Sequence, residues 1–230
     1  MTITDEKQLA GFIDHTLLAA TATGEQIRQL CQEAKQYGFC AVSVNPRWVS
    51  LVADELHGSR IKVGGVVSLP LGADSTRVKV AQAKEVVLEG ADEIDMVADL
   101  AAIIEDDELY LSSQLKAVLK VCRSMRPAVV LKVIIESAAL SREQKIFACQ
   151  IADKCGVDFV KTRTGMNPAG GATIADVKLM RESAPRCRVK AAGGIRTLKQ
   201  VLEMLDAGAE RIGTSSGVQI INELRAGQQQ

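Results

Sequence analysis

The stretch Lys154-Cys155-Gly156-Val157-Asp158-Phe159-Val160-Lys161 joins a helix-like segment to a short apolar run through a single glycine. Glycine directly after a helix is a common stop signal, because it adopts a left-handed backbone at little steric cost. Three near-copies of this arrangement occur elsewhere, at Tyr37-Gly38-Phe39, Glu89-Gly90-Ala91-Asp92 and Asp206-Ala207-Gly208-Ala209-Glu210. The repetition predicts a unit in which a helix ends, glycine turns the chain and a strand begins.

Eight short and mostly apolar runs predict strands that are buried on both faces, as in parallel sheets. They are Gly11–Leu18, Ala41–Val44, Ile61–Val67, Glu93–Val97, Val129–Ile135, Asp158–Lys161, Arg188–Ala191 and Arg211–Gly213. Helical periodicity marks Gly24–Gly38, Asp74–Gly90, Glu105–Met125, Ser141–Gly156, Thr173–Ser183, Thr197–Gly208 and Ser216–Leu224. This alternation predicts an α/β protein, a single (β/α)₈ TIM barrel. A doubly wound open sheet is the rival, but no G-x-G-x-x-G follows the first strand.

The composition suits one packed domain over residues 1–230 and argues against several classes of partner. Of 230 residues, 47% are hydrophobic and 3% aromatic, and 28 basic residues balance 28 acidic ones. We therefore expect no attraction to nucleic acid and none to an anionic membrane. The polar start at Met1–Lys7 lacks the features of a signal peptide, which predicts a cytoplasmic protein. The polar end, residues 225–230, is expected to form a frayed tail.

The six cysteines predict neither a disulfide framework nor a metal site. None of them forms a C-x-x-C pair, and the only histidines are His15 and His57. These spacings do not resemble the ligand patterns of zinc sites. We expect reduced thiols that pack as small hydrophobic side chains, and we expect His15 to be a satisfied barrel residue rather than a catalyst.

In a barrel of this kind the active site lies at the carboxyl ends of the strands, so the residues there carry the functional information. The fourth predicted strand contains Glu93-Ile94-Asp95-Met96-Val97, and alternation places Glu93 and Asp95 on one face. A carboxylate within an apolar strand is costly unless it has partners. Asp95 is therefore a candidate catalytic residue, with a structural ion pair as the alternative.

Two lysines close neighbouring predicted strands, Lys161 in the sixth and Lys190 in the seventh. Adjacent strands are about 4.8 Å apart, so inward-facing side chains would bring two ammonium groups together. Repulsion and desolvation both favour the neutral amine, which attacks carbonyl carbons. Lys132 in the fifth strand would add a third charge. The alternative is that each lysine is salt-bridged, for example Lys132 with Glu136 or Asp95.

Glycine-rich loops follow the seventh and eighth predicted strands. They are Gly193-Gly194-Ile195-Arg196-Thr197 and Gly213-Thr214-Ser215-Ser216-Gly217. Loops at these places, next to a helix N-terminus, form the usual phosphate site of this fold, although ordinary turn glycines are the alternative. The residues alone thus predict carbonyl chemistry through a Schiff base, without a metal or cofactor, on a substrate the size of a sugar phosphate.

Several motifs together resemble the deoxyribose-phosphate aldolase family. They are Ile13-Asp14-His15-Thr16, Pro70-Leu71-Gly72-Ala73, Glu93-Ile94-Asp95-Met96-Val97, Leu131-Lys132-Val133-Ile134-Ile135-Glu136, Val160-Lys161-Thr162, Thr164-Gly165 and the two glycine-rich loops. The resemblance extends from Phe12 to about Leu224. It implies a class I aldolase that reversibly cleaves 2-deoxy-D-ribose 5-phosphate to D-glyceraldehyde 3-phosphate and acetaldehyde.

The resemblance also implies roles for individual residues. Lys161 matches the Schiff-base lysine, Lys190 the second lysine that lowers its pKa, and Asp95 the carboxylate of the proton relay. The residues that match the phosphate-binding set are Gly165, Gly193, Gly194, Gly213, Ser215 and Ser216. The expected partners are a small-molecule sugar phosphate and an aldehyde. Apolar residues around Leu109-Tyr110-Leu111 are compatible with a homodimer, but the sequence does not fix the oligomeric state.

The chain departs from the family pattern at three places: Arg163 replaces a usual serine, Met166 stands where phenylalanine or another residue is usual, and Ser68-Leu69 replaces a common Gly-Phe. Alternation would aim Arg163 back toward the pocket mouth, where it would bind an anion, lower the lysine pKa or block the usual substrate. Two alternatives therefore stay open: a Schiff-base aldolase for a different sugar phosphate, and a non-catalytic sugar-phosphate binding protein. Trp48 is expected in the core, at an interface or at the rim.

Overall fold

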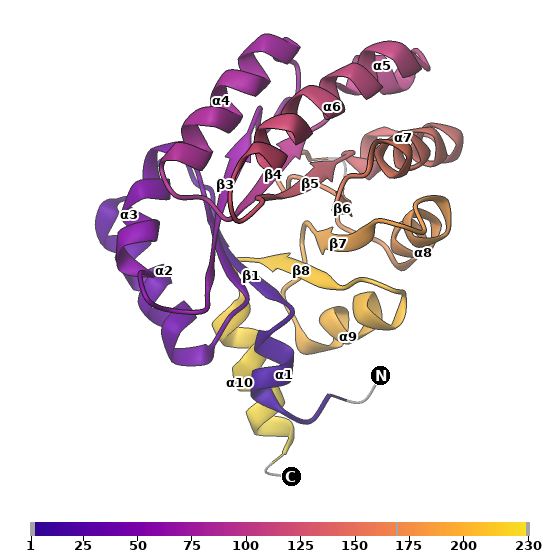
Figure 1. Cartoon of the computed structure of the whole chain (residues 1–230). Helices are drawn as coiled ribbons and strands as arrows, with labels where there is room; N and C mark the ends of the chain where they lie inside the picture. The colour runs from indigo at the N-terminus through magenta and orange to yellow at the C-terminus, as the bar shows by residue number, and fades with distance from the viewer. Residues whose placement is uncertain (1–2, 169, 229–230) are drawn as a thin grey trace.

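The computed structural model describes residues 3–168 and 170–228, and its centre is a closed barrel of eight parallel strands (Figure 1). The strands are β1 (Ile13–Leu17), β2 (Ala41–Val44), β3 (Lys62–Val67), β4 (Glu93–Val97), β5 (Val130–Ile134), β6 (Phe159–Lys161), β7 (Arg188–Ala192) and β8 (Arg211–Thr214). They pair in chain order, and β8 pairs with β1 to close the ring. The prediction of a (β/α)₈ TIM barrel is confirmed.

Helices surround the barrel and connect its strands. They are α2 (Gly24–Tyr37), α3 (Val49–Glu55), α4 (Thr76–Leu88), α6 (Glu108–Ser124), α7 (Arg142–Cys155), α8 (Ile174–Ser183), α9 (Leu198–Asp206) and α10 (Gly217–Gly227), with the short additions α1 (Glu6–Ala10), α5 (Leu100–Ile104), η1 (Pro46–Trp48) and η2 (Ser137–Ala139). Within the described ranges, no helix is both long and apolar enough to cross a membrane.

Local signals in the sequence explain where the helices begin and end. Gly38 and Gly156 end α2 and α7 with left-handed backbones at φ 73° and 78°, as the repeated glycine turn predicts. A serine or threonine with a glutamine three residues later forms a capping box at the start of α2, α7 and α9. The buried side chains of α2 are the predicted apolar stripe, Ile27, Leu30, Cys31 and Ala34.

Three sequence-based predictions are wrong in detail. Helix α3 was not predicted, because its short span offers too few turns for a clear helical period. The expected helix Glu105–Met125 begins three residues later, at Glu108, since Asp107 caps the start of α6 by accepting a hydrogen bond from the Tyr110 N–H, and the separate short helix α5 ends just before it. The tail is not frayed at Arg225–Gly227, which belongs to α10; the Arg225 guanidinium binds the Glu6 carboxylate at 2.7 Å, and residues 229–230 lie outside the described part.

Candidate active site in the barrel

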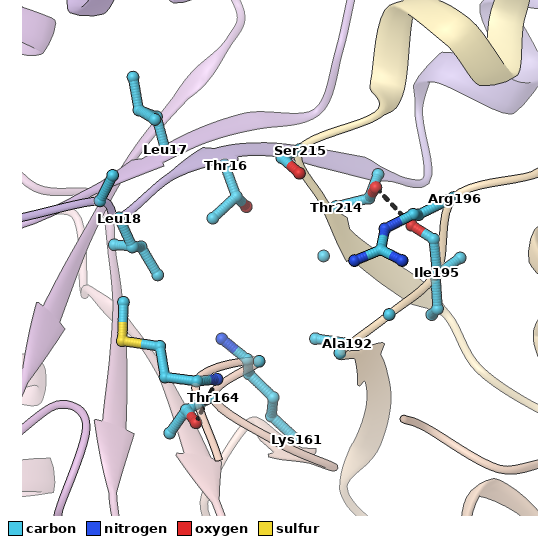
Figure 2. Close-up of a pocket in the computed structure, with 16 residues that line it drawn as sticks. Thr16, Leu17, Leu18, Lys161, Thr164, Ala192, Ile195, Arg196, Thr214 and Ser215 are labelled. Atoms are coloured by element: carbon cyan, nitrogen blue, oxygen red, sulfur yellow. Dashed lines mark hydrogen bonds between the residues drawn. The ribbon is translucent and has the colours of Figure 1, made fainter. Parts of the chain in front are cut away.

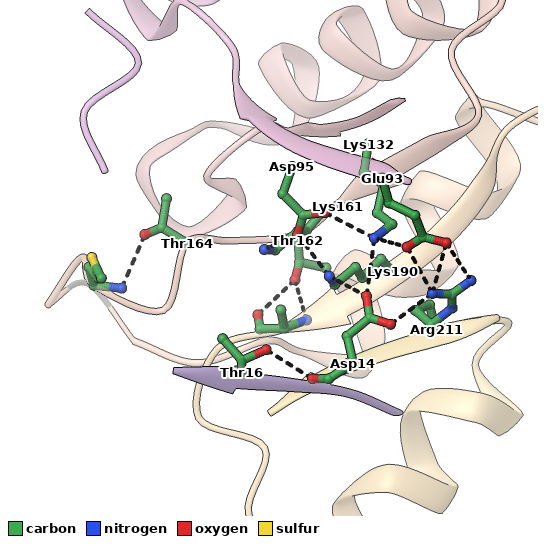
Figure 3. Close-up of polar contacts among 12 residues, drawn as sticks. Asp14, Thr16, Glu93, Asp95, Lys132, Lys161, Thr162, Thr164, Lys190 and Arg211 are labelled. Carbon is green, nitrogen blue, oxygen red and sulfur yellow. Dashed lines mark hydrogen bonds and ion pairs between the residues drawn. The ribbon is translucent and has the colours of Figure 1, made fainter. Parts of the chain in front are cut away.

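Seven charged side chains from six strands meet inside the barrel (Figure 3). Three are carboxylates, Asp14 on β1 with Glu93 and Asp95 on β4, and four are cations, Lys132 on β5, Lys161 on β6, Lys190 on β7 and Arg211 on β8. Strand register explains the gathering, because Asp95 lies beside Lys132 and Lys161 beside Lys190 in the ladders. The structure thus brings the three predicted catalytic residues together.

Asp95 is the centre of the upper part of this cluster. Its Oδ2 accepts hydrogen bonds from the Nζ of Lys161 at 2.6 Å and of Lys190 at 2.7 Å. Its Oδ1 lies 3.1 Å from the Nζ of Lys132. Burial alone would raise the pKa of the Asp95 carboxyl, but the three lysines hold that pKa well below its usual range. Asp95 is therefore an ionised carboxylate shared between two amines.

Lys161 has the electrostatics expected of a nucleophilic amine. Its pKa is lowered from 10.5 to about 8 with burial as the largest cause; the positive charge of Lys190 also lowers this pKa, and Asp95 raises it. The sequence predicted both repulsion by the second lysine and desolvation as causes. The structure makes desolvation the larger cause, because Asp95 stands between the two ammonium groups.

The charge balance of the cluster points to the same residue. Four cations face three carboxylates, so the loss of one proton makes the group neutral overall. Nearby carboxylates raise the pKa values of Lys132 and Arg211 and keep both protonated. Lysines lower the pKa of Asp14, which stays ionised. Because the pKa of Lys161 is lowered, this amine readily gives up its proton.

The Lys161 amine extends into a cavity of about 300 Å³ at the carboxyl ends of the strands (Figure 2). Five residues of the predicted phosphate set line this cavity, namely Gly165, Gly193, Gly194, Gly213 and Ser215. Ser216 lies next to the cavity wall as the N-cap residue of α10. Residues that the sequence reasoning did not assign also line it, among them Thr16, Thr164, Ala192 and Arg196. The mouth of this cavity is therefore built by several loops that lie far apart in the sequence.

The wall opposite the cluster suits an anion. Gly193 and Gly194 have positive φ angles of 105° and 75°, which glycine adopts at little steric cost, and the lack of side chains lets a ligand approach their backbone N–H groups closely. The Thr214 hydroxyl donates to the Ile195 carbonyl at 2.7 Å and accepts from the Ser216 N–H at 2.9 Å, which fastens the two loops to each other. Helix α10 begins directly behind them, and the exposed Arg196 adds a cation.

The expected direction of Arg163 is wrong. Its side chain is fully buried and does not line the cavity; its Nε donates to the Glu136 carboxylate at 3.1 Å. Strand β6 ends at Lys161, so the two-residue alternation that would aim Arg163 at the pocket mouth does not continue this far. Met166, the second departure from the family pattern, does line the cavity and is partly exposed.

The structure also places Ser68, which belongs to the third departure from the family pattern, and the residues His15 and Trp48. The Ser68 hydroxyl donates to Asp74 at 2.9 Å, outside the cavity wall. His15 faces outward from β1 and pairs with Glu33 at 2.7 Å, and burial lowers the pKa of this histidine. Trp48 lies in η1, half-buried against the core, with the Arg47 guanidinium over its ring.

Comparisons with known proteins agree with this geometry. The model of the DeoC/LacD family of aldolases matches residues 9–223. The chain belongs to this family. It is 46% identical to the deoxyribose-phosphate aldolase of Caldicellulosiruptor saccharolyticus over 219 residues, covering 95% of this chain and 99% of that one. It is 49% identical to that of Thermococcus gammatolerans over 220 residues, covering 94% and 96%.

A solved structure in the family extends the comparison to three dimensions. The tetrameric deoxyribose-phosphate aldolase of Aeropyrum pernix superimposes with a TM-score of 0.87 at 30% identity, covering 97% of this chain and 94% of that one. The family thus has the same closed barrel, and the resemblance inferred from the sequence motifs is confirmed.

Proposed function

We propose that this protein is a class I aldolase that cleaves 2-deoxy-D-ribose 5-phosphate reversibly to D-glyceraldehyde 3-phosphate and acetaldehyde. The observation that carries the proposal is the Lys161 amine, which is buried, has a pKa lowered to about 8, and extends into a cavity with an anion-binding wall. The named relatives support the choice of substrate.

The first step forms a bond between the enzyme and the sugar. The neutral Nζ of Lys161 attacks the aldehyde carbon C1 of the open-chain sugar, and the carbinolamine loses water to give an iminium ion. Asp95 accepts hydrogen bonds from both Lys161 and Lys190, so Asp95 and Lys190 can move the protons that this dehydration requires. The glycine-rich wall holds the 5-phosphate at the far end of the cavity.

The second step breaks the C2–C3 bond. Asp95, through a water molecule or Lys190, takes the proton of the C3 hydroxyl, and C3 becomes the aldehyde of glyceraldehyde 3-phosphate. The electron pair of the broken bond moves to C2, where the iminium delocalises it as an enamine. Protonation of C2 and hydrolysis of the imine then release acetaldehyde and regenerate the amine. The iminium is the electron sink for this reaction.

The two alternatives left open by the sequence receive no separate support. A different substrate was motivated by Arg163 at the pocket mouth, and Arg163 instead pairs with Glu136. A non-catalytic binding protein has no need for a buried amine of lowered pKa beside a shared carboxylate. The homodimer and the cytoplasmic location remain predictions.

Reductive trapping tests this function. Acetaldehyde with borohydride should leave one ethyl group on Lys161, seen by mass spectrometry of peptides, and Lys161→Leu should abolish both the label and turnover of deoxyribose 5-phosphate. Lys199→Leu is the matched control, because Lys199 is strongly exposed and distant from the barrel interior. Labels found only on exposed lysines, or an active Lys161→Leu variant, would contradict the proposal.

A further inference from the structure

The loop after β6 is held by an ion pair that the aldolase reaction itself does not use. Arg163 is fully buried, and a buried guanidinium is stable only with a well-placed partner. Glu136, at the end of β5, supplies it: Oε1 accepts from the Nε of Arg163 at 3.1 Å. This glutamate is also buried, and it has a left-handed backbone at φ 51°, which is uncommon outside glycine.

The second carboxylate oxygen of Glu136 holds the same loop at another point. Oε2 accepts from the Thr164 hydroxyl at 2.7 Å and from the Thr164 N–H at 3.1 Å. The Thr164 oxygen in turn accepts from the Met166 N–H at 3.1 Å. One buried carboxylate thus fixes the chain on both sides of Gly165, which lines the cavity.

Arg163 connects this loop to the glycine-rich loop after β7. Its Nη2 donates to the Asn167 carbonyl at 3.0 Å. Its stem runs under Gly193, where a Cβ atom would lie 3.4 Å from the Cβ of Arg163 and 3.5 Å from its Cδ. The Ala172 N–H donates to the Gly193 carbonyl at 2.9 Å and joins the two loops again. Arg163 is therefore packed behind the wall that faces the anion.

The same two side chains are separate from the chemistry. Lys161 and Lys190 pair with Asp95, and Lys190 pairs also with Asp14, whereas Arg163 pairs with Glu136. A disturbance of Arg163 should therefore reach the substrate through the position of the glycine loops, not through the charge of the amine.

We propose that Arg163 and Glu136 are positioning residues for phosphate recognition: their buried pair sets the spacing of the loops that carry Gly165 and Gly193. The proposal rests on the function proposed above. It assigns the pair an effect on the binding of the 5-phosphate and not on imine formation.

The experiment compares the loss of an arginine ion pair at each end of β6. Arg163→Ser removes the arginine behind the phosphate wall. Arg123→Ser is the control, because Arg123 makes a more exposed ion pair at the opposite end, donating to Asp158 at 2.9 Å and to the Val129 carbonyl. Arg163→Lys keeps the charge beside Glu136 but loses the guanidinium N–H that donates to the Asn167 carbonyl. Thermal melting shows which variants are folded, and Arg163→Lys serves if Arg163→Ser does not fold.

Two measurements follow on each folded variant. Calorimetric titration with inorganic phosphate should show a dissociation constant about tenfold higher in Arg163→Ser than in Arg123→Ser. In turnover, the loss should fall on KM for deoxyribose 5-phosphate, so that the preference for this sugar over unphosphorylated 2-deoxyribose drops about tenfold.

The outcomes separate the two proposals. Equal losses on both sugars, or unchanged phosphate affinity in a folded Arg163 variant, would overturn the positioning role. A wild-type protein that turns over neither sugar would overturn the aldolase function, and the phosphate titration would still decide the role of Arg163.

Discussion

Lys132 and Lys161 stand on neighbouring strands inside one barrel, both are buried, and their pKa values move in opposite directions. Lys132 contacts three carboxylates, with its Nζ 3.2 Å from Asp14, 2.5 Å from Glu93 and 3.1 Å from Asp95. Among the carboxylates of the described residues, Lys161 pairs only with Asp95, and it shares that carboxylate with Lys190. The number of carboxylates for each ammonium group therefore decides which lysine stays charged.

The difference divides the barrel interior into two regions. The lower region holds Lys132, Arg211, Asp14 and Glu93 in a network in which every charge has more than one opposite partner. The pairs Lys132–Asp95 and Asp14–Lys190 link it to the upper region. In the upper region Oδ2 of Asp95 serves the amines of both Lys161 and Lys190, and Lys161 lines the cavity. A fully paired network stabilises structure, whereas an under-paired amine next to a cavity can react.

The largest effect is expected when the upper carboxylate is neutralised. Asp95→Asn should lower kcat by about 10²–10⁴-fold, because proton transfer to and from the C3 hydroxyl and C2 is lost while the amine remains. Steady-state rates with deoxyribose 5-phosphate measure this. Asp54→Asn, on the exposed surface of α3, is the control. Near-normal turnover in Asp95→Asn would mean that the upper region does not carry the proton relay.

A substitution in the lower region is expected to lower the unfolding free energy of the protein. Lys132→Met leaves Asp14 and Glu93 with one fewer buried cation, and breaking a buried pair costs about 3–5 kcal/mol of unfolding free energy. Urea denaturation of this variant and of the exposed control Lys199→Met measures the difference. If Lys132→Met were as stable as the control, the ion pairs of Lys132 in the lower region would contribute nothing to stability, and the assignment of a structural role to this region would be wrong.

The sequence predicted the upper region better than the lower one, for a physical reason. Asp95, Lys161 and Lys190 each close or interrupt an apolar strand, so the cost of burying them marks them as functional. Asp14 and Arg211 were not assigned, although Asp14 also interrupts an apolar run. They meet at 2.7 Å only when β8 closes onto β1, a pairing between the two ends of the chain that no local pattern encodes.

Arg163 shows a second limit of reading the sequence. The alternation of β6 was extended past its last residue, Lys161, and the Arg163 side chain was therefore assigned to the pocket mouth. The left-handed turn at Glu136 and the short β6 decide where Arg163 lies, and neither leaves a trace in composition or periodicity. The glycine-rich loops were predicted from the sequence because glycine itself indicates a backbone conformation that other residues rarely adopt.

A third lysine tests whether a lowered pKa is enough to make a nucleophile. Burial lowers the pKa of Lys79 to about 8, as for Lys161, but its Nζ donates to the Val97 carbonyl at 2.8 Å and to Gln114 Oε1 at 2.9 Å, away from the cavity. Trapping with acetaldehyde and borohydride should rise about tenfold per pH unit up to pH 8 at Lys161, because the neutral amine is the reactive form and protonation removes it below that pH.

Lys79 should stay unlabelled across the same pH range, since an amine that is neutral but enclosed cannot reach an aldehyde. Quantitative peptide mass spectrometry reads both sites in one sample, so Lys161 is the internal standard. Equal labelling of Lys79 would show that a lowered pKa alone makes a lysine reactive. Access to the cavity would then not be what distinguishes Lys161 from other buried lysines.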